Sequence, residues 1–308
     1  MPLDVAAAPR PLSGDLAGRR IEAVVNGLSG SVGLGGAKAL EAMLQERGLE
    51  AHVVDAPPGG IGEAVHAALA NRPDVLIVLA GDGTANLAAG LSGADGPLIA
   101  PLPGGTMNML PHALYGQVDW KTALEATLAA PTERAVSGGE IGGKPFYVAA
   151  MLGSPALWAP AREAVRRMRW RLALMHGVRA CQRAFTGRLR VRFDGLPEER
   201  VPALTLMCPL VSKVLPDSAG CLEAAELDFH SALDAARLGL RTLTGAWRDD
   251  SAVTVRRVTH GVVETRTRIP AILDGEAHRL PSRCEIVFRP VAFRALVPQA
   301  TAPAQAHG

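Results

Sequence analysis

Three glycine-rich segments contain the residue types best suited to chemistry in this 308-residue chain. Each follows a short apolar run, and they are Asn26–Gly30 (NGLSG), Ala80–Thr84 (AGDGT) and Pro103–Thr106 (PGGT). Glycine lets the backbone come close to an anion, and the amides that open a following helix favour negative charge. One such turn can be no more than a tight connection. Three of them, each with a serine or threonine hydroxyl, favour a phosphate-binding site.

Asp82 is the unusual residue of the second segment, because a carboxylate beside a phosphate is repulsive unless a cation or a sugar hydroxyl lies between them. One interpretation is structural, since aspartate commonly caps a helix or stabilises a turn. The other is functional: an indirect contact through Mg²⁺, or a role in orienting a nucleotide. The absence of a GxxxxGK(S/T) motif excludes a P-loop enzyme, and the first segment lacks the GxGxxG spacing of dehydrogenases.

Two acidic residues, Asp274 and Glu276, flank a glycine near the C-terminal end of the chain. Asp-Gly is a common hairpin turn, and these residues lie between two predicted strands. A kinase, in contrast, needs a carboxylate that accepts the proton of the attacking hydroxyl. Both interpretations are open at this point.

The glycine-rich segments belong to an alternation of strands and helices over residues 21–130. The alternation predicts an open α/β sheet, in which the turns after the strands meet at one edge, where ligands bind. The apolar run 75–79 is typical of a parallel strand covered on both faces. The predicted strands are 21–25, 52–54, 75–79 and 98–100, and the main predicted helices are 37–44, 64–70, 84–91 and 120–130.

From about residue 136 the pattern changes to short strands, several of them alternating in polarity, which predict a second, mainly antiparallel domain. Residues 1–19 and 301–308 are predicted to be flexible ends. The predicted strands are 146–148, 189–193, 204–207, 253–255, 262–265 and 285–288, with one helical insert over 161–185.

Composition narrows the classes of function. Hydrophobic residues make up 48 % of the chain, which excludes an intrinsically disordered protein. The net charge is +2 and aromatic residues make up only 4 %, which disfavours a nucleic-acid binder. The four cysteines show no CxxC spacing, which disfavours a zinc or redox site. Because the sequence has no signal peptide and no apolar run near the roughly 20 residues of a membrane span, we expect a cytoplasmic protein.

The segment Arg162–Arg192 contains ten arginines and a single acidic residue, Glu163. A solvated helix whose arginine stems cover apolar neighbours explains this composition. The functional alternative is a peripheral contact with an anionic membrane, where each basic residue contributes about 1 kcal/mol. RNA would attract the same charges, but the chain has no RNA-binding motif, so nucleic acid is not an expected partner.

Four motifs carry a resemblance to a known family. They are NGLSG at 26–30, AGDGTAN at 80–86, PLPGGTMN at 101–108 and DGE at 274–276. Their order and spacing resemble the diacylglycerol kinase catalytic family, which also contains sphingosine kinases and bacterial lipid kinases. The resemblance covers residues 20–298 and implies phosphorylation of diacylglycerol or a related lipid alcohol by ATP. It also implies a Rossmann-like α/β ATP-binding domain (20–134, with a return at about 291–300) and a β-sandwich lipid-substrate domain (135–290), with the nucleotide between them.

The resemblance also implies roles for single residues. Asp274 and Glu276 correspond to the family's catalytic acidic pair, and Asp82 is a third catalytic candidate. A structural Mg²⁺ site corresponds to Val214, Asp217 and Ala219. The residues that correspond to nucleotide contacts are Asn26, Gly27, Leu28, Ser29, Gly30, Asp55, Ala80, Gly81, Asp82, Gly83, Thr84, Ala85, Asn86, Gly104, Gly105, Thr106 and Asn108.

Some residues depart from the family pattern. Ala80 replaces the first glycine of the nucleotide loop, Gly27 replaces a proline, and Leu87 stands where many members have a glutamate. An asparagine that the family has near the start of its second domain is missing from 146–153. Two alternatives therefore stay open: an NAD kinase-like enzyme, which shares the GDGT loop, and a nucleotide-binding pseudokinase that acts as a membrane-associated regulatory protein.

Overall fold

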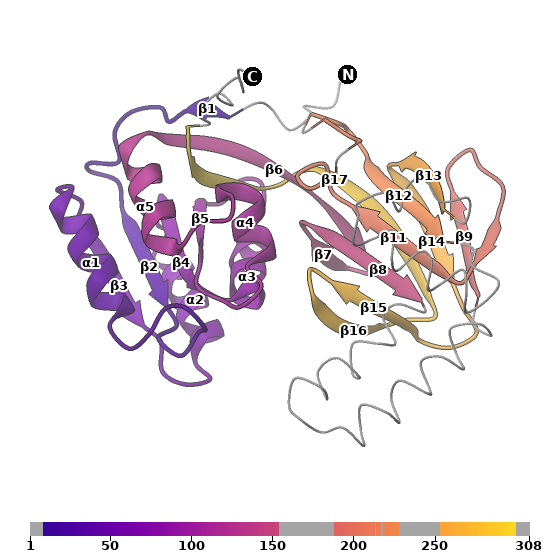
Figure 1. The fold of residues 1–308 in the computed structure, drawn as a ribbon, viewed down its shortest axis with the longest axis horizontal. Helices are drawn as coiled ribbons and strands as arrows, with labels where there is room; N and C mark the ends of the chain where they lie inside the picture. The colour runs from indigo at the N-terminus through magenta and orange to yellow at the C-terminus, as the bar shows by residue number, and fades with distance from the viewer. Residues whose placement is uncertain (1–8, 154–187, 213, 217, 228–252, 300–308) are drawn as a thin grey trace, which may run out of the picture. The chain divides into compact units, whose positions relative to one another are not determined.

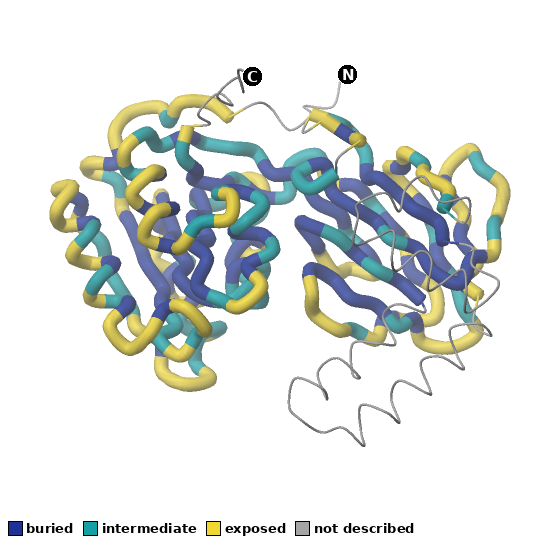
Figure 2. Tube along the Cα trace, viewed as in Figure 1, coloured by how far each residue is buried: buried dark blue, intermediate teal, exposed yellow. Residues whose placement is uncertain are grey.

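The computed structural model describes residues 9–153, 188–212, 214–216, 218–227 and 253–299. The chain divides into two units, residues 1–137 with 290–308 and residues 138–289. Figure 1 follows the chain through both units, and Figure 2 shows that the strands form the buried centre of each. Among the helices of the described residues, none is long and apolar enough to cross a membrane.

A parallel sheet forms the centre of the first unit, in the order β17–β5–β4–β2–β3. Every residue of β2, β4 and β5 is buried, because these strands are covered on both faces. The strands are β2 (Ile21–Val25), β3 (Ala51–Asp55), β4 (Val75–Ala80), β5 (Leu98–Pro103) and the C-terminal part of β17 (Arg283–Pro298).

Helices cover both faces of this sheet, which confirms the predicted α/β fold. α1 (Gly36–Glu46) and α5 (Trp120–Ala129) pack on one face, where their buried side chains share a core with alternate residues of β2, β4 and β5. α2 (Ile61–Ala70), α3 (Asp82–Ser92) and α4 (Met109–Tyr115) pack against one another on the opposite face. All four strand ends that precede these helices lie at one edge of the sheet.

Two antiparallel sheets form the second unit. One has the order β10–β9–β14–β17 and continues through β6 to β7, and the other has the order β13–β12–β11–β8–β15–β16. Side chains of both sheets belong to one hydrophobic core, as in a β-sandwich. The strands are β6 (Pro131–Ile141), β7 (Lys144–Phe146), β8 (Ala149–Gly153), β9 (Leu189–Phe193), β10 (Glu199–Val201), β11 (Ala203–Met207), β12 (Leu222–Leu227), β13 (Val253–Val258), β14 (His260–Glu264), β15 (Ile269–Leu273) and β16 (Glu276–Leu280).

The structure adds strands that were not predicted and changes two expectations. β12 (LEAAEL) is one of the added strands: its residues have high helix propensity, but it pairs with β11 and β13 and all of its residues are buried. The strand expected over 146–148 ends at Phe146, and the next begins at Ala149. In the stretch expected to be flexible, β1 (Arg10–Pro11) pairs with β6 and Leu16 is buried. The helical insert expected over 161–185 and residues 301–308 lie outside the described residues.

Candidate functional site

The three glycine-rich turns of the first unit contact one another through hydrogen bonds. The N–H of Ser31 donates to the carbonyl of Gly104 over 3.2 Å, and the Ser31 hydroxyl donates to the carbonyl of Pro103 over 3.2 Å. The N–H of Gly104 donates to the carbonyl of Ala80 over 3.2 Å. The turns after β2, β4 and β5 are therefore joined into one structure at the carboxyl edge of the sheet.

Glycine is required where two of these turns meet. A Cβ atom on Gly105 would lie 2.8 Å from the Cα of Gly81, closer than real Cβ contacts allow. A Cβ on Gly81, in contrast, would meet nothing nearer than the Ser29 hydroxyl at 3.6 Å and the Cα of Gly105 at 3.9 Å. The missing side chain of Gly81 thus leaves a small space that is lined by a hydroxyl and by backbone.

The N-terminus of α3 opens beside this space. α3 begins at Asp82, directly after Gly81, and this N-cap glycine has no side chain that could cap it. The first N–H groups of a helix have no partner within the helix and carry the positive end of its dipole. The donor set of helix amides, the Ser29 hydroxyl and the nearby Thr106 hydroxyl fits a phosphate group.

Side chains in the first turns of α3 differ in what they offer a ligand. Ala85 is buried in the core, so only its backbone is available. Gly83, Thr84 and Asn86 are half-buried, and the N–H groups of Thr84 and Ala85 donate back to the carbonyl of Gly81. Of the nucleotide contacts implied for residues 83–86, those of Gly83 and of the Thr84 and Asn86 side chains are therefore the ones that remain accessible.

Asn108 holds the third turn in shape. Its backbone is left-handed, with φ 50°, which asparagine tolerates better than most residues. Its Oδ1 accepts the N–H of Gly105 over 2.6 Å, and its Nδ2 donates to the carbonyl of Gly105 over 3.0 Å. Because Asn108 is buried and both ends of its amide bind Gly105, it positions this turn.

Asn26 stabilises the first glycine-rich turn. The Oδ1 of Asn26 accepts the N–H of Leu28 over 3.1 Å, whereas the Leu28 side chain is largely exposed. A Cβ on Gly27 would lie 3.4 Å from the Oδ1 of Asp55, at the end of β3. Asp55 and the turn are thus neighbours. Gly30 is equally close to the third turn, since its Cβ would lie 3.2 Å from the Oγ1 of Thr106.

Asp82 caps a helix, but not the helix that it begins. Its Oδ1 accepts the N–H of Leu110 over 3.3 Å at the start of α4. Burial raises the pKa of the Asp82 carboxyl, and backbone hydrogen bonds at the start of α4 act in the opposite direction. The structural interpretation of this residue is therefore supported, and the carboxylate also lies next to Gly81.

Asp274 and Glu276 lie in the second unit and differ in their surroundings. Asp274 and Gly275 form the turn between β15 and β16, and both have positive φ, 45° and 87°, as a type I′ hairpin requires. The Asp274 carboxylate is 2 % exposed and accepts three backbone N–H groups: Tyr147 over 2.7 Å, Val148 over 2.9 Å and Ala149 over 2.9 Å. Glu276 is exposed.

The Asp274 carboxylate therefore fills the break between β7 and β8. A carboxylate has about four acceptor positions, and three of them are occupied by amides. Its negative charge, together with burial as the larger cause, raises the pKa of the Tyr147 hydroxyl. Sequence reasoning had no signal for this role, because the partners are backbone groups more than 120 residues away.

The implied Mg²⁺ site is described only in part. Asp217 lies outside the described residues, Val214 is exposed, and Ala219 donates its N–H to the carbonyl of Pro216 over 2.8 Å. Within the described part of the chain, no three His, Cys, Asp or Glu side chains gather as metal ligands would. Mg²⁺ at this segment stays a prediction.

A buried glutamate near this segment was missed as a site residue. Glu223 is 1 % exposed on β12, and its Oε2 accepts the Ser212 hydroxyl over 2.5 Å. The Ser212 oxygen in turn accepts the N–H groups of Val214 and Leu215. In the sequence, Cys221–Glu223 (CLE) stands where the family often has an acidic Asp-Gly after its magnesium segment, and this departure gives no sign of the role that Glu223 has in the structure.

The comparison with protein families agrees with the phosphate-binding geometry of the three turns. Residues 20–139 match the family described as the diacylglycerol kinase catalytic domain, so the resemblance inferred from the motifs is confirmed there. No curated protein matches the sequence.

Solved structures share the fold. A diacylglycerol kinase from Bacillus anthracis str. Sterne has a TM-score of 0.65 at 14 % identity, covering 92 % of this chain and 98 % of that chain. An NAD kinase from Archaeoglobus fulgidus in complex with ATP has a TM-score of 0.50 at 12 % identity, and the match covers 91 % of this chain and 94 % of that chain. Yeast NADH kinase complexed with NADH has a TM-score of 0.54 at 9 % identity, and the match covers 92 % of this chain and 85 % of that chain.

Asp274→Asn should destabilise the protein. An asparagine places an N–H₂ group where one carboxylate oxygen accepts an amide, so a buried donor loses its partner. We expect the free energy of unfolding to fall by about 3 kcal/mol, measured by urea denaturation. The matched control, Glu276→Gln, alters an exposed side chain and should stay within about 0.5 kcal/mol of the parent. Equal stability of the two variants would contradict the role of Asp274 in filling the break between β7 and β8.

Asp82→Asn should change how stability depends on pH. Because the pKa of Asp82 is raised on folding, the folded protein keeps this proton to a higher pH than the unfolded chain does, and the parent loses stability as pH rises through that interval. The asparagine oxygen can still accept the N–H of Leu110. We expect equal melting temperatures in acid and a higher one for the variant at neutral pH.

Asp119→Asn is the control of opposite sign. The Thr122 hydroxyl donates to Asp119 over 2.8 Å and lowers its pKa, so this carboxylate stabilises the fold at neutral pH and ceases to do so in acid. That variant should melt below the parent at neutral pH. If both variants shifted in the same direction, the assignment for Asp82 would be wrong.

Proposed function

We propose that this chain, whose residues 20–139 match the model of the diacylglycerol kinase catalytic domain, transfers the γ-phosphoryl group of ATP to the hydroxyl of a lipid alcohol. Diacylglycerol or a related lipid alcohol is the proposed acceptor. The observation that carries the proposal is the space at Gly81, which is bounded by the Ser29 hydroxyl, the Gly105 backbone and the N-terminus of α3.

The first unit supplies the phosphate contacts in this proposal. Backbone N–H groups at the start of α3 and the hydroxyls of Ser29 and Thr106 would donate to phosphate oxygens, where charge accumulates during transfer. Asn108 keeps the third turn in place through Gly105. Asp55, beside the first turn, is suited to accept a hydrogen bond from a sugar hydroxyl.

The base that receives the proton of the lipid hydroxyl is assigned to Glu276. Asp274 is buried and its oxygens bind three amides, whereas Glu276 is exposed. Asp82, whose pKa is raised by burial, is the second candidate, because a raised pKa suits a proton acceptor near neutral pH. Mg²⁺ bound with ATP would neutralise phosphate charge in such a reaction.

An NAD kinase-like activity is the alternative enzyme, since solved NAD and NADH kinases share the fold. The family match of residues 20–139 favours the lipid kinase. A pseudokinase that binds ATP without transferring phosphate is the second alternative. Leu87, in place of the family's usual glutamate, supports it.

Gly81→Val should abolish most ATP binding without unfolding the protein. The backbone of Gly81 is extended (φ −83°, ψ 174°), which valine adopts readily, and its Cβ would clash with nothing. The side chain would instead fill the proposed phosphate space. We expect ATP affinity to fall tenfold or more, roughly the loss of one hydrogen bond to a charged group, measured by calorimetry.

Gly62→Ala provides the control for this variant. It adds a methyl group on α2 at an ordinary 3.7 Å from Leu87, outside the proposed site, and should bind ATP like the parent. Unchanged ATP affinity in a folded Gly81→Val protein would remove the assignment of the nucleotide site.

Glu276→Gln should lower kcat about 10²- to 10⁴-fold while ATP affinity is kept, because it preserves shape and removes the base. Transfer of labelled γ-phosphate is measured on diacylglycerol, monoacylglycerol, a sphingoid base, phosphatidylglycerol and NAD. Phosphorylation of NAD alone would favour the alternative enzyme, and ATP binding with no transfer to any acceptor would favour the pseudokinase. Full turnover by Glu276→Gln would reassign the base to Asp82.

A further inference from the structure

A row of charged residues crosses four strands of the second unit. In the register of the sheet, Arg200 of β10 lies opposite Arg190 of β9, Arg190 opposite Glu264 of β14, and Glu264 opposite Arg283 of β17. Residues that lie opposite one another point to the same face of a sheet. The alternate residues of β9 are buried in the core, so this row lies on the outer face.

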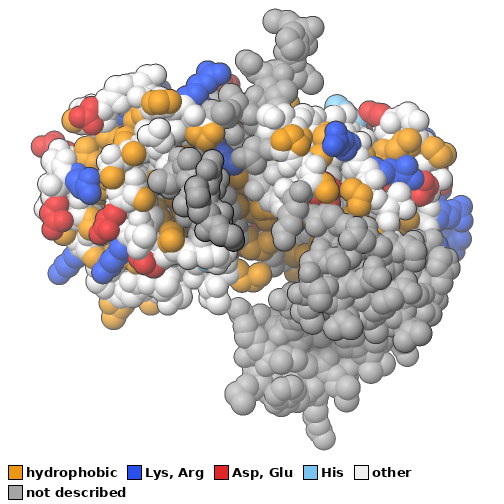
Figure 3. Space-filling model, turned by 45° about the horizontal axis from the view of Figure 1, so that its top comes forward, with side chains coloured by type: hydrophobic (Ala, Val, Ile, Leu, Met, Phe, Trp, Pro, Cys, Tyr) orange, Lys and Arg blue, Asp and Glu red, His pale blue; other side chains and the backbone are white. Residues whose placement is uncertain are grey.

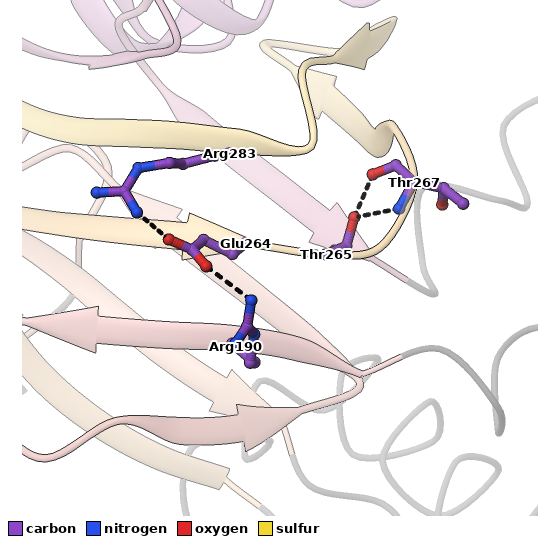
Figure 4. A network of polar contacts seen from close by, with 5 residues as sticks. All are labelled: Arg190, Glu264, Thr265, Thr267 and Arg283. Carbon is purple, nitrogen blue, oxygen red and sulfur yellow. Dashed lines mark hydrogen bonds and ion pairs between the residues drawn. The ribbon is translucent and has the colours of Figure 1, made fainter.

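One carboxylate holds two of these arginines. Glu264 accepts the Nη2 of Arg190 at its Oε2 over 2.8 Å and the Nη1 of Arg283 at its Oε1 (Figure 4). The side chains of Arg190 and Arg283 remain 46 % and 61 % exposed. Because one carboxylate faces two guanidinium groups, this trio keeps a net positive charge.

The other arginines of this face have no acidic partner among the described residues. Arg200 and Arg192 are exposed and form no ion pair there, and Arg192 lies opposite Val262. Like charges directly opposite one another destabilise a sheet, and Glu264 offsets the charge of Arg190 only in part because it also binds Arg283, so the Arg200–Arg190 pair is unfavourable. Figure 3 shows basic and acidic side chains on both units on the face that it draws.

We infer that these four residues, Arg190, Arg192, Arg200 and Arg283, form an arginine face that binds an anionic lipid surface through its phosphate groups. Guanidinium groups bind phosphate in a bidentate manner, and several of them on the flat face of a sheet match a flat array of headgroups. The anions would relieve the repulsion between Arg190 and Arg200. The outward positions of β9, β10 and β14 carry no Phe, Tyr or Trp for base stacking, which favours lipid over single-stranded nucleic acid.

The arginine face places the membrane contact that was expected for Arg162–Arg192 on named residues of a sheet. Only the end of that segment is described, and there Arg190 and Arg192 belong to the arginine face, together with two arginines from outside the segment. The inference goes beyond the proposed function, because binding to a lipid surface requires neither ATP nor phosphoryl transfer. It can therefore be tested separately from the kinase activity.

Co-sedimentation without ATP tests the arginine face. The vesicles contain either phosphatidylcholine alone or equal parts of phosphatidylcholine and phosphatidylglycerol. We expect binding to the anionic vesicles only, weakening as salt screens the exposed charges. Arg192→Gln with Arg200→Gln should lower the partition coefficient about twenty-fivefold, because each basic residue at such a surface contributes about fivefold.

Three controls make the result specific. Arg47→Gln with Arg279→Gln removes the same charge from exposed positions on other elements and should bind like the parent. Arg192→Lys with Arg200→Lys should retain most of the binding. Arg200→Gln alone should melt no lower than the parent, since it removes a like-charge pair, and a loss of binding at undiminished stability identifies a binding residue.

Four outcomes of the binding measurements would overturn the inference. They are equal binding of the parent to both kinds of vesicle, full binding by the Arg192/Arg200 double variant, an equal loss in the Arg47/Arg279 control, and displacement from anionic vesicles by an equal concentration of duplex DNA. Aggregation of Arg200→Gln with unchanged vesicle binding would also overturn it, because the arginines would then serve only to protect the edge strand β10.

Discussion

The first unit depends on the close contact between the second and third glycine-rich turns. No side chain fits on Gly105, whose Cβ would lie 2.8 Å from the Cα of Gly81, or on Gly104, whose Cβ would lie 2.9 Å from the backbone of Ala80. This approach permits the hydrogen bond between Gly104 and Ala80. Strand ends that are separate in the sequence thus form one rigid edge, and the Ser29 hydroxyl and the start of α3 are brought within reach of a single phosphate group.

Two aspartates connect distant segments by accepting backbone N–H groups. Asp82 joins the start of α3 to the start of α4, and Asp274 joins the β15–β16 turn to the break between β7 and β8. Burying a carboxylate is costly unless hydrogen bonds compensate, and here the compensation comes from amides that would otherwise be unpaired. An acidic residue in a kinase-like motif can therefore be required for the fold, independently of any role in proton transfer.

The sequence predicted the parts of the structure that depend on local pattern. A β-rich run identified β2 and a continuous apolar run identified β4, and glycine positions identified the turns that follow them, because burial on both faces and close backbone approach leave a mark in composition. It did not identify β12, where pairing on both sides overrides the helix propensity of LEAAEL. It also could not separate Asp274 from Glu276, since burial and backbone partners decide between them and neither appears in a motif.

Charge is distributed differently in the three glycine-rich turns and on the arginine face. Residues 26–36, 80–91 and 101–109 contain one charged side chain, Asp82, so an anion there would be bound by amide dipoles and hydroxyls. Such dipoles leave most of a triphosphate's charge unbalanced, which is a physical reason to expect a cation with the nucleotide. The arginine face instead uses exposed formal charges, whose attraction falls off over about 8 Å at physiological ionic strength. Binding at the turns should consequently tolerate salt that weakens binding at the face, so ionic strength can separate the two events in one protein.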